Sequence, residues 1–406
     1  MSNNSKISNN TGKTILQILI ISITIYSSYL YANEGVFVLG NDAYQLGRAS
    51  SGIASPRSAY WCYMNPASMV ELNKRLDLNW YIVKTDIEMH PRGLIGNRFE
   101  SPLEGDGLFN IASGGMIIPL DVGTLGVGLY VPSGTGVDYQ NSRNILSRLW
   151  NADRKLFYQH MRLVVAYGYK FDNGWAIGGG IHGSVSRFKS DHITLSLLPT
   201  EGDFDWDESY GAGFNLSIYK KWEKFAIGAT YTSRHWTERF QHYKDLLRYP
   251  LDQPQILNAG VAYDVNDKLT LSLDFKWLNW EGIPAYGRDL TDGGFNWVNQ
   301  FCTKLGVEYR INDKTRILAG YSHGNSPITE DHVFLAGLVP VLCEDHFTLG
   351  LARKITEHDE VSLSGVVGLK NKMTDTGNGD LLSHLGQGTE LSTGGFSIVL
   401  GYTHHF

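Results

Sequence analysis

The sequence is poor in charged residues, in cysteine and in long hydrophobic runs. Asp, Glu, Lys and Arg make up 19% of its 406 residues, below the roughly 25% usual for soluble domains. The formal net charge of -6 argues against a nucleic-acid-binding protein, which carries a clustered excess of Lys and Arg. Three cysteines without a CxxC spacing form neither a disulfide framework nor a thiolate metal site, so we expect no metal and no cofactor. Only one run, near the N-terminus, approaches the roughly 20 apolar residues of a spanning helix, which excludes a bundle of membrane helices.

Glycine and aromatic residues are abundant, and apolar residues recur at every second position. The chain has 45 Gly, 10 Trp, 22 Tyr and 17 Phe, an aromatic content that excludes a disordered protein. Alternation is clearest in residues 163–171, 269–277 and 396–402. Successive side chains of a strand point to opposite faces, so each of these segments is predicted to form a strand with one apolar face.

Fourteen such strands are predicted between residues 75 and 406. Many run about 9–12 residues, the length that a tilted strand needs to cross a bilayer. Short links such as 172–173 alternate with long ones such as 281–298, the arrangement of outer-membrane proteins. Unpaired strand edges are not tolerated in hydrocarbon, so the sheet must close. The predicted fold class is therefore all-β: a transmembrane antiparallel β-barrel of about 14 strands, spanning residues 75–406.

The N-terminus has the features of a secretory signal. Lys6 and Lys13 precede a mainly apolar run, residues 15–32, that ends at the small residue Ala32. We expect residues 1–32 to be a signal peptide that directs export and is removed after Ala32. An uncleaved membrane anchor is the alternative, and the polar residues within the short apolar run argue against it.

Residues 33–74, between the signal and the first predicted strand, do not alternate over any long run. They are rich in small residues, which suit a compact element whose backbone approaches its surroundings closely. A periplasmic tail, the alternative, would carry more charge and fewer aromatic residues. We therefore predict an N-terminal hatch, a plug inside the lumen of the barrel.

Several motifs in order along the chain carry a resemblance to a known family. Gly-Arg-Ala stands at 47–49, Ser-Gly at 51–52 and Asn-Pro-Ala at 65–67. Residues 254–282 and 305–328 each read as a hairpin, the first ending in a Trp motif and the second followed by Gly-Tyr and Ser-Pro pairs. Together these segments resemble the FadL family of outer-membrane long-chain fatty acid transporters, whose barrel has fourteen strands.

The resemblance implies a function. It implies passive uptake of hydrophobic molecules across the bacterial outer membrane, with capture at the extracellular side, a lumen pocket and a lateral exit. It places the hatch and its gating role on Gly47, Arg48, Asn65, Pro66 and Ala67. A long-chain fatty acid is the expected ligand, and an aromatic hydrocarbon is the alternative within the same family. The expected partners are this hydrophobic small molecule and outer-membrane lipid, with no nucleic acid.

The third predicted strand, over 123–131, is the candidate for the lateral opening. Gly126, Gly128 and Pro132 would weaken its pairing with a neighbouring strand. Dense packing of the same glycines against the hatch explains them equally well at this stage.

The loop predicted over 132–158 is the candidate for ligand capture. Ile145, Leu146, Leu149 and Trp150 fall on one face of a helix, which suits an apolar groove at the surface. A loop helix that packs on its own barrel would show the same pattern, so both interpretations remain.

Arg187 and Lys189 are the candidates for binding a ligand carboxylate, because the family carries basic residues in this region. Their odd numbers place them on the same face as Ile181 and Val185, which should meet lipid. Arg187 would reach the lumen only if a bulge resets the register, or would serve a site above the bilayer.

The C-terminal strand ends in Phe406, which resembles the signal that barrel-assembly machinery recognises. We expect a monomer. No nucleophile stands beside a base in a recognisable constellation, so we do not expect an enzyme. A barrel of this kind could also serve as a general porin or as an adhesin, and a plug-like first segment argues against the porin.

Overall fold

Fourteen long strands form the wall of a barrel in the part of the chain that the structure describes. This computed structural model describes residues 34–96, 102–105, 107–139, 154–190 and 205–406. Two further strands, β2 (Leu103–Glu104) and β9 (Trp236–Thr237), have only two residues each. The long strands are β1 (Arg75–His90), β3 (Gly107–Pro119), β4 (Thr124–Tyr139), β5 (Arg154–Lys170), β6 (Trp175–Ser190), β7 (Asp207–Lys221), β8 (Phe225–Thr232), β10 (Ile256–Asn266), β11 (Leu269–Leu278), β12 (Gln300–Asn312), β13 (Thr315–Gly324), β14 (Asp345–Lys354), β15 (Asp359–Thr374) and β16 (Glu390–His405).

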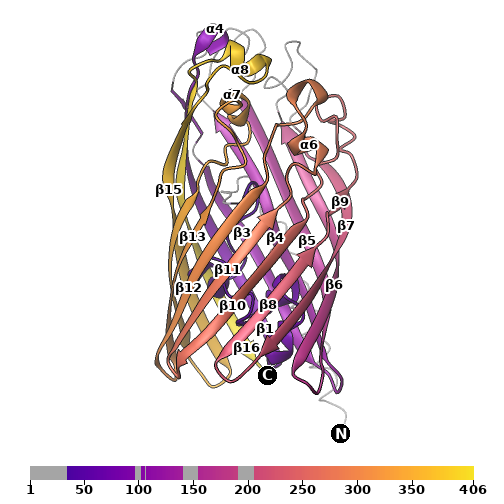
Figure 1. The fold of residues 1–406 in the computed structure, drawn as a ribbon, viewed down its shortest axis with the longest axis vertical. Helices are drawn as coiled ribbons and strands as arrows, with labels where there is room; N and C mark the ends of the chain where they lie inside the picture. The colour runs from indigo at the N-terminus through magenta and orange to yellow at the C-terminus, as the bar shows by residue number, and fades with distance from the viewer. Residues whose placement is uncertain (1–33, 97–101, 106, 140–153, 191–204) are drawn as a thin grey trace, which may run out of the picture.

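The sheet closes on itself. Consecutive long strands pair antiparallel around the barrel, and β16 returns to pair with β1 from Arg75↔His405 to His90↔Glu390. Figure 1 shows the tilted strands of this single closed sheet. The predicted fold class is therefore confirmed, including its fourteen strands. Closure satisfies the backbone groups that an open sheet edge would leave unpaired.

The apolar rows predicted from alternation lie on the outer face. Leu163 on β5 is 51% exposed and Ile181 on β6 is 71% exposed, whereas His182 beside it is buried. The same alternation runs along β12 and β14. Large apolar side chains that face outward all around a closed sheet would be costly in water and are suited to lipid.

The two ends of the barrel differ. Short turns lie at the end where the C-terminus is found, and the long links gather at the opposite end (Figure 1). These links carry the short helices α4 (Gly93–Gly96), α6 (Pro284–Gly287), η2 (Leu290–Asp292), α7 (Val333–Ala336) and α8 (Leu381–Leu385). No helix among the described residues has the length and apolar character needed to cross a membrane.

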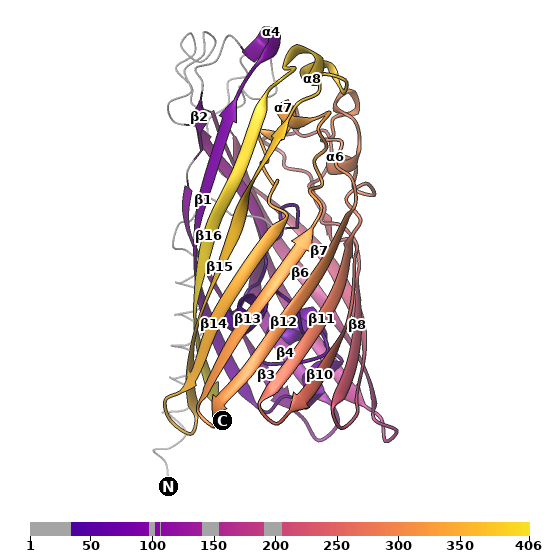
Figure 2. The same cartoon turned by 60° about the vertical axis from the view of Figure 1, so that its left-hand side comes forward.

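The segment before β1 lies inside the lumen, where the sequence predicted a hatch. It contains α2 (Ala43–Gly47), α3 (Trp61–Met64) and η1 (Ser68–Glu71), and nearly all of its described residues are buried. Figures 1 and 2 both show this indigo and purple segment within the lower half of the barrel. The predicted signal peptide, residues 1–32, lies outside the described residues.

The third predicted strand, over 123–131, begins as predicted but ends later than predicted. β4 runs to Tyr139 and β5 begins at Arg154, so strands take both ends of the loop predicted over 132–158. Pro132 is typical of a loop, but here it lies where β4 has a bulge and no β3 partner on one side. Proline needs no ladder donor at such a position.

Candidate functional site

The backbone of the hatch motif Asn-Pro-Ala packs directly against glycines of the wall. A Cβ added to Gly168 would lie 2.4 Å from the carbonyl oxygen of Pro66, and one added to Gly178 would lie 2.3 Å from the nitrogen of Ala67. That nitrogen donates a hydrogen bond of 2.8 Å to Ser217 Oγ. Only glycine permits so close an approach of two backbones, so the wall residues of β5 and β6 are fitted to the hatch.

Gly47 makes a similar contact on the opposite side of the lumen. A Cβ added to Gly350 would lie 3.2 Å from Gly47 Cα, and Thr348 Oγ1 donates a hydrogen bond of 3.1 Å to the Gly47 carbonyl. Asn65 acts within the hatch instead, because its Nδ2 donates to the Ile53 carbonyl at 2.9 Å. Gly47, Pro66 and Ala67 therefore contact the wall through their backbone, whereas Asn65 stabilises the hatch itself through its side chain.

Arg48, the fifth, belongs to a buried charge cluster centred on Glu308 of β12. Arg48 Nη1 lies 3.7 Å from Glu308 Oε2, and the Nε atoms of Arg57 and Arg316 lie 2.7 Å and 3.6 Å from its carboxylate oxygens. Arg48 also donates to Ser55 Oγ at 3.2 Å. Two of these arginines come from the hatch and one comes from the wall, so Glu308 ties the hatch to the barrel.

Asp42 caps the first hatch helix. Its carboxylate accepts hydrogen bonds of 2.9 Å from the Gln45 nitrogen and from Ser58 Oγ. Burial raises the pKa of Asp42 to about 6, and these two hydrogen bonds limit the rise. The hatch thus holds a carboxyl group that titrates near neutral pH.

The pairing between β3 and β4 stops halfway along the strands. It covers six positions, from Pro119↔Thr124 to Gly114↔Leu129, whereas β4 stays paired with β5 as far as Tyr139. Among the described pairings, no partner from β3 meets β4 beyond Leu129. This seam is therefore an interruption in the hydrogen-bonded wall.

The start of the hatch takes the place of the missing partner. Val38 N donates to the Pro132 carbonyl at 3.0 Å, and Gly134 N donates to the Val36 carbonyl at 2.8 Å. The β4–β5 register shifts between Tyr130 and Ser133, which puts Pro132 in a bulge at this point. Residues 36–38 thus lie along the edge of β4 at the seam.

The three residues predicted for the lateral opening have different surroundings. Gly126 faces the hatch, because an added Cβ would lie 2.5 Å from Cys62 Cβ, and Gly128 lies under the ring of Tyr130. Both glycines lie in the paired half of β4, so dense packing accounts for them. Pro132 alone lies where pairing with β3 has ended.

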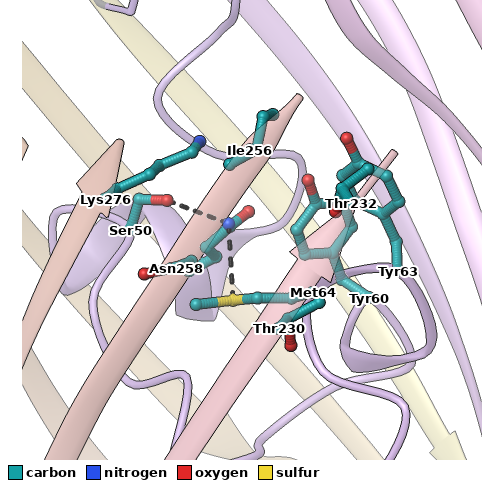
Figure 3. A pocket seen from close by; sticks show the side chains of 10 residues that line it. Ser50, Tyr60, Tyr63, Met64, Thr230, Thr232, Ile256, Asn258 and Lys276 are labelled. Atoms are coloured by element: carbon teal, nitrogen blue, oxygen red, sulfur yellow. Dashed lines mark hydrogen bonds between the residues drawn. The ribbon is translucent and has the colours of Figure 1, made fainter. Parts of the chain in front are cut away.

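A polar cavity lies between the hatch and the wall. It has a volume of about 40 Å³, room for two or three waters at about 10–15 Å³ each. Figure 3 shows Lys276, Thr230 and Asn258 of the wall around it, facing Ser50 and Tyr63 of the hatch. The oxygens Thr230 Oγ1 and Asn258 Oδ1 are buried and accept no hydrogen bond from the described residues, so this cavity suits water.

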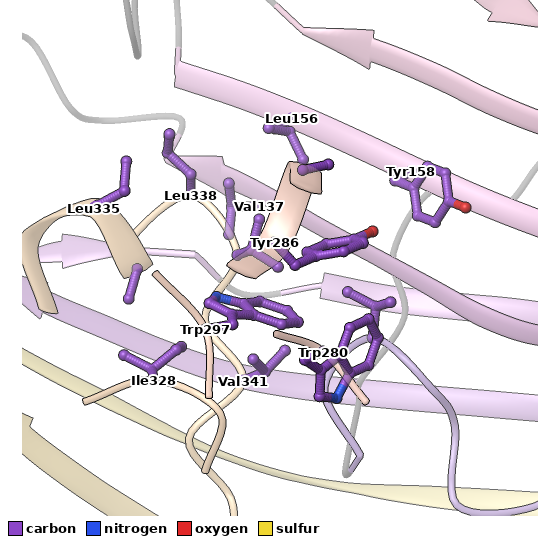
Figure 4. Close-up of a cluster of buried hydrophobic side chains, with 14 of the residues drawn as sticks. Val137, Leu156, Tyr158, Trp280, Tyr286, Trp297, Ile328, Leu335, Leu338 and Val341 are labelled. Carbon is purple, nitrogen blue, oxygen red and sulfur yellow. The ribbon is translucent and has the colours of Figure 1, made fainter. Parts of the chain in front are cut away.

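Above the hatch, the lumen is filled by a large apolar cluster. Trp280 is fully buried at its centre, with ring centroids 5.8 Å from Phe37, 4.9 Å from Tyr286 and 5.0 Å from Trp297. Figure 4 shows the rings of Trp280, Tyr286 and Trp297 among side chains from the wall and from the long links, including Leu335. A cavity of about 20 Å³ lies within this cluster, and most of the residues that line it are apolar, such as Val36, Leu156 and Val339.

Two lysines at the base of the apolar cluster bind one carboxylate. Glu34, the first described residue, is 1% exposed and forms ion pairs with Lys276 of β11 and Lys304 of β12. Lys276 Nζ also lies 5.6 Å from the centre of the Phe37 ring. Burial alone would raise the pKa of Glu34, but the two ammonium groups outweigh it and lower the pKa to about 2.

Lys276 and Lys304 were not predicted from the sequence, although alternation contained the signal. Each lysine stands on the face opposite the apolar row of its strand, which is the lumen face, and the register places Lys304 opposite Asp274. Two lysines on adjacent inward faces are unusual enough to suggest a bound anion.

Arg187 and Lys189 lie on the outer side of β6. The pairing of β6 with β5 and β7 shows no register shift among its described positions, so the bulge that would turn Arg187 inward is absent. Arg187 Nη2 instead pairs with Glu208 Oε1 at 2.8 Å, and both side chains are more than 40% exposed. Arg187 and Lys189 therefore do not reach the lumen. A role above the bilayer remains a prediction.

The residues predicted to capture the ligand, Ile145, Leu146, Leu149 and Trp150, lie outside the described residues.

Comparison with known proteins places this architecture in a family. A sequence profile described as outer membrane protein transport protein (OMPP1/FadL/TodX) matches residues 24–403. No curated protein matches the chain with significance. Among solved structures, the P. putida toluene transporter TodX superposes with a TM-score of 0.68 at 15% identity, covering 91% of this chain and 99% of its own. A Pseudomonas aeruginosa FadL homologue gives a TM-score of 0.68 at 14% identity, covering 92% and 100%.

The Ralstonia pickettii toluene transporter TbuX gives a TM-score of 0.64 at 15% identity, covering 91% of this chain and 99% of its own. Identities this low show a shared fold, whereas the profile match over most of the chain shows descent. Members of this family are transport channels for hydrophobic compounds rather than enzymes. The chain belongs to the OMPP1/FadL/TodX family of outer membrane transport proteins.

Proposed function

We propose that this protein takes up long-chain fatty acids, or closely similar amphipathic molecules, passively across the outer membrane. The observation that carries the proposal is the apolar cluster above the hatch with two lysines at its base. Exposing a hydrocarbon chain to water costs about 0.8 kcal/mol per CH₂ group, so an apolar lumen lowers the barrier to passage. The lysines supply the charge that a carboxylate head group needs.

The route runs from the extracellular end to the seam between β3 and β4. The ligand is captured at the long links, where the predicted groove with Ile145 and Trp150 belongs, and then enters the apolar cluster. It leaves sideways past Pro132, where β4 lacks its β3 partner. Gly47, Arg48 and the Asn-Pro-Ala motif keep the hatch seated below it, which blocks a straight aqueous path.

The test is ligand extraction from the purified protein followed by mass spectrometry, together with uptake into proteoliposomes. We expect fatty acids among the extracted molecules and faster uptake of oleate than in protein-free liposomes. Recovery of only sugars or peptides, with no accelerated oleate uptake, would rule out this function. Liposome swelling in sugar solutions separates a general porin, which passes sugars, from a barrel closed by its hatch.

An aromatic hydrocarbon is the second candidate. Trp280, Tyr286 and Trp297 lie within the apolar cluster in edge-to-face and tilted contacts, and aromatic side chains in these arrangements suit a flat apolar ligand. TodX and TbuX, which share the fold, are toluene transporters. Competition between toluene and oleate for uptake separates the two: strong toluene transport without oleate transport would favour the hydrocarbon.

Processing and assembly complete the proposal. Residues 1–32 act as a signal peptide cleaved after Ala32, and N-terminal sequencing of the mature protein should begin at Asn33. The barrel works as a monomer and is inserted by the barrel-assembly machinery through β16. Phe406→Ala should lower the amount of folded protein in the outer membrane, and an unchanged amount would refute this role of the C-terminal residue.

A further inference from the structure

We infer that Lys276 and Lys304 form the binding site for the ligand carboxylate, and that Glu34 of the protein itself occupies this site in the resting state. The inference rests on the proposed uptake of a carboxylate-bearing ligand. It goes further by assigning the head-group site and by making the start of the hatch an internal competitor for it.

The geometry of the site supports this assignment. The Glu34 carboxylate contacts both ammonium groups, one through each oxygen, as a ligand carboxylate would. Lys304 has a fully buried side chain, and Lys276 is only 15% exposed. Removal of the anion would be strongly destabilising, because it would leave two buried ammonium groups without the carboxylate that they share.

This cost makes the site selective. Glu34 can leave at low cost only if another anion takes its place, because Glu34 carries the one carboxylate among the described residues that contacts both ammonium groups, and Asp274 faces Lys304 alone across the strands. A fatty acid carboxylate restores the same charge balance, whereas an alcohol or a hydrocarbon of equal length does not. The charged pair therefore works as an exchange site for carboxylates.

The hydrocarbon chain of the ligand also needs space that side chains near Glu34 now fill. The cavity in the apolar cluster has a volume of about 20 Å³, space for one or two waters at about 10–15 Å³ each and far too little for a long hydrocarbon chain. Val36 lines this cavity and Phe37 packs on Trp280, two and three residues after Glu34. Release of Glu34 with this segment would withdraw both side chains and make room for the chain of the ligand.

The polar cavity beside Lys276 adds a second feature. It opens next to the lysine and is lined by hydroxyl and amide groups, including Thr230 and Asn258. A displaced carboxylate, or the head group of an incoming ligand, would remain solvated there. The displaced Glu34 carboxylate would therefore still have polar partners after it leaves the lysines.

The experiment measures the binding of oleate and of oleyl alcohol to the purified full-length barrel in detergent. The two probes share one chain and differ in the charge of the head group. Glu34→Gln removes the internal carboxylate, and we expect it to tighten oleate binding by about tenfold while oleyl alcohol binding changes by less than about twofold. Glu71→Gln is the matched control. Glu71 forms an ion pair of 2.7 Å with Lys170, away from the two lysines of this site, so its substitution should change neither affinity.

A second set of variants tests the lysines and guards against misfolding. Lys276→Met combined with Lys304→Met should reduce oleate affinity to that of the alcohol. If Glu34→Gln does not fold, as judged by heat-modifiable mobility on a gel, Glu34→Gln with Lys276→Gln is compared with Lys276→Gln alone. The double variant should still bind oleate more tightly.

The outcomes separate this inference from the proposed function. Unchanged or weaker oleate binding in Glu34→Gln, or equal tightening of both probes, overturns the inference even if both probes bind. Failure of every variant and of the wild type to bind either probe overturns the proposed uptake of fatty acids itself.

Discussion

The lower and upper halves of the lumen are filled in different ways. Below, the hatch meets the wall through backbone at glycines such as Gly168 and Gly178 and through the charges around Glu308. Above, side chains from the wall and the long links form an apolar cluster around Trp280. The lower contacts are directional and tolerate little change, while apolar contacts above depend mainly on area.

The difference matches the work that we propose for each half. A hatch that blocks water must return to one position, which close backbone fit and paired charges specify. A site for hydrophobic molecules must accept a flexible chain, which non-directional contacts permit. Changes in the lower half should therefore disturb the hatch more than changes in the upper half.

Gly178→Leu should have the largest effect. Its side chain would enter the space of Pro66 and Ala67, and overpacking costs about 1–3 kcal/mol or more. We expect the hatch to lose its seat and the ion conductance in planar bilayers to rise strongly. Gly183→Leu on the same strand is the control, because an added Cβ there has no neighbour within 4 Å. Equal conductance of the two variants would contradict the close fit.

Glu308→Gln should have the next largest effect. It leaves Arg48, Arg57 and Arg316 without their shared carboxylate, at a cost of about 3–5 kcal/mol. We expect a lower urea concentration at which protease cleaves the hatch. Glu208→Gln, which removes an exposed pair with Arg187, should cost at most about 1 kcal/mol. A shift no larger than that of this control would show that Glu308 does not hold the hatch.

Asp42 should make the hatch sensitive to pH. Its pKa is raised from 3.8 to about 6 by burial, so its contribution to stability is complete below pH 4 and is lost as the pH rises through 6. The loss amounts to at most about 3 kcal/mol. Asp42→Asn should therefore protect the hatch from protease at pH 7 relative to the wild type, and should make no such difference at pH 4. The same difference at both pH values would exclude titration as its cause.

Trp280→Ala should disturb the hatch least, although Trp280 is large and fully buried. The truncation leaves an apolar void above the hatch, and such voids bind small aromatic molecules. We expect low ion conductance, as in the wild type, with tighter toluene binding. Trp80→Ala on the outer face, where Trp80 is 54% exposed, should change neither property. Open-channel conductance in Trp280→Ala would mean that the two halves are not independent.

Most of the barrel followed from local pattern, and the exceptions are instructive. Alternation predicted a strand over 269–277, and β11 (Leu269–Leu278) agrees with it to one residue, because the outer face of this strand meets lipid along its length. It ended the third strand at residue 131, whereas β4 continues to Tyr139 with both faces buried from Tyr130 onward. Alternation reports a difference between two faces, so it disappears where both faces are covered. The start of the hatch along the β4 edge could not be predicted for the same reason.

The candidate site was predictable in part. The hatch motifs marked residues that do contact the wall, but the partners Gly168, Gly178 and Gly350 were not identifiable among 45 glycines. Arg187 was predicted to bind a carboxylate because the family carries basic residues in this region. Its position in the alternation of β6, on the same face as Ile181, already placed it on the outer face. Lys276 and Lys304 required the register between neighbouring strands before they could be seen as a pair.

By itself, the sequence determined that the chain forms long two-faced strands, because consecutive side chains of a strand point to opposite faces and the alternation is visible in the order of the residues. It also determined which face meets lipid, since apolar side chains occupy that face. Only the tertiary structure decided that Glu34 meets a lysine 242 residues away, and that β4 loses one partner halfway along the barrel. Such contacts depend on closure and on the register between strands distant in sequence, which no local pattern encodes.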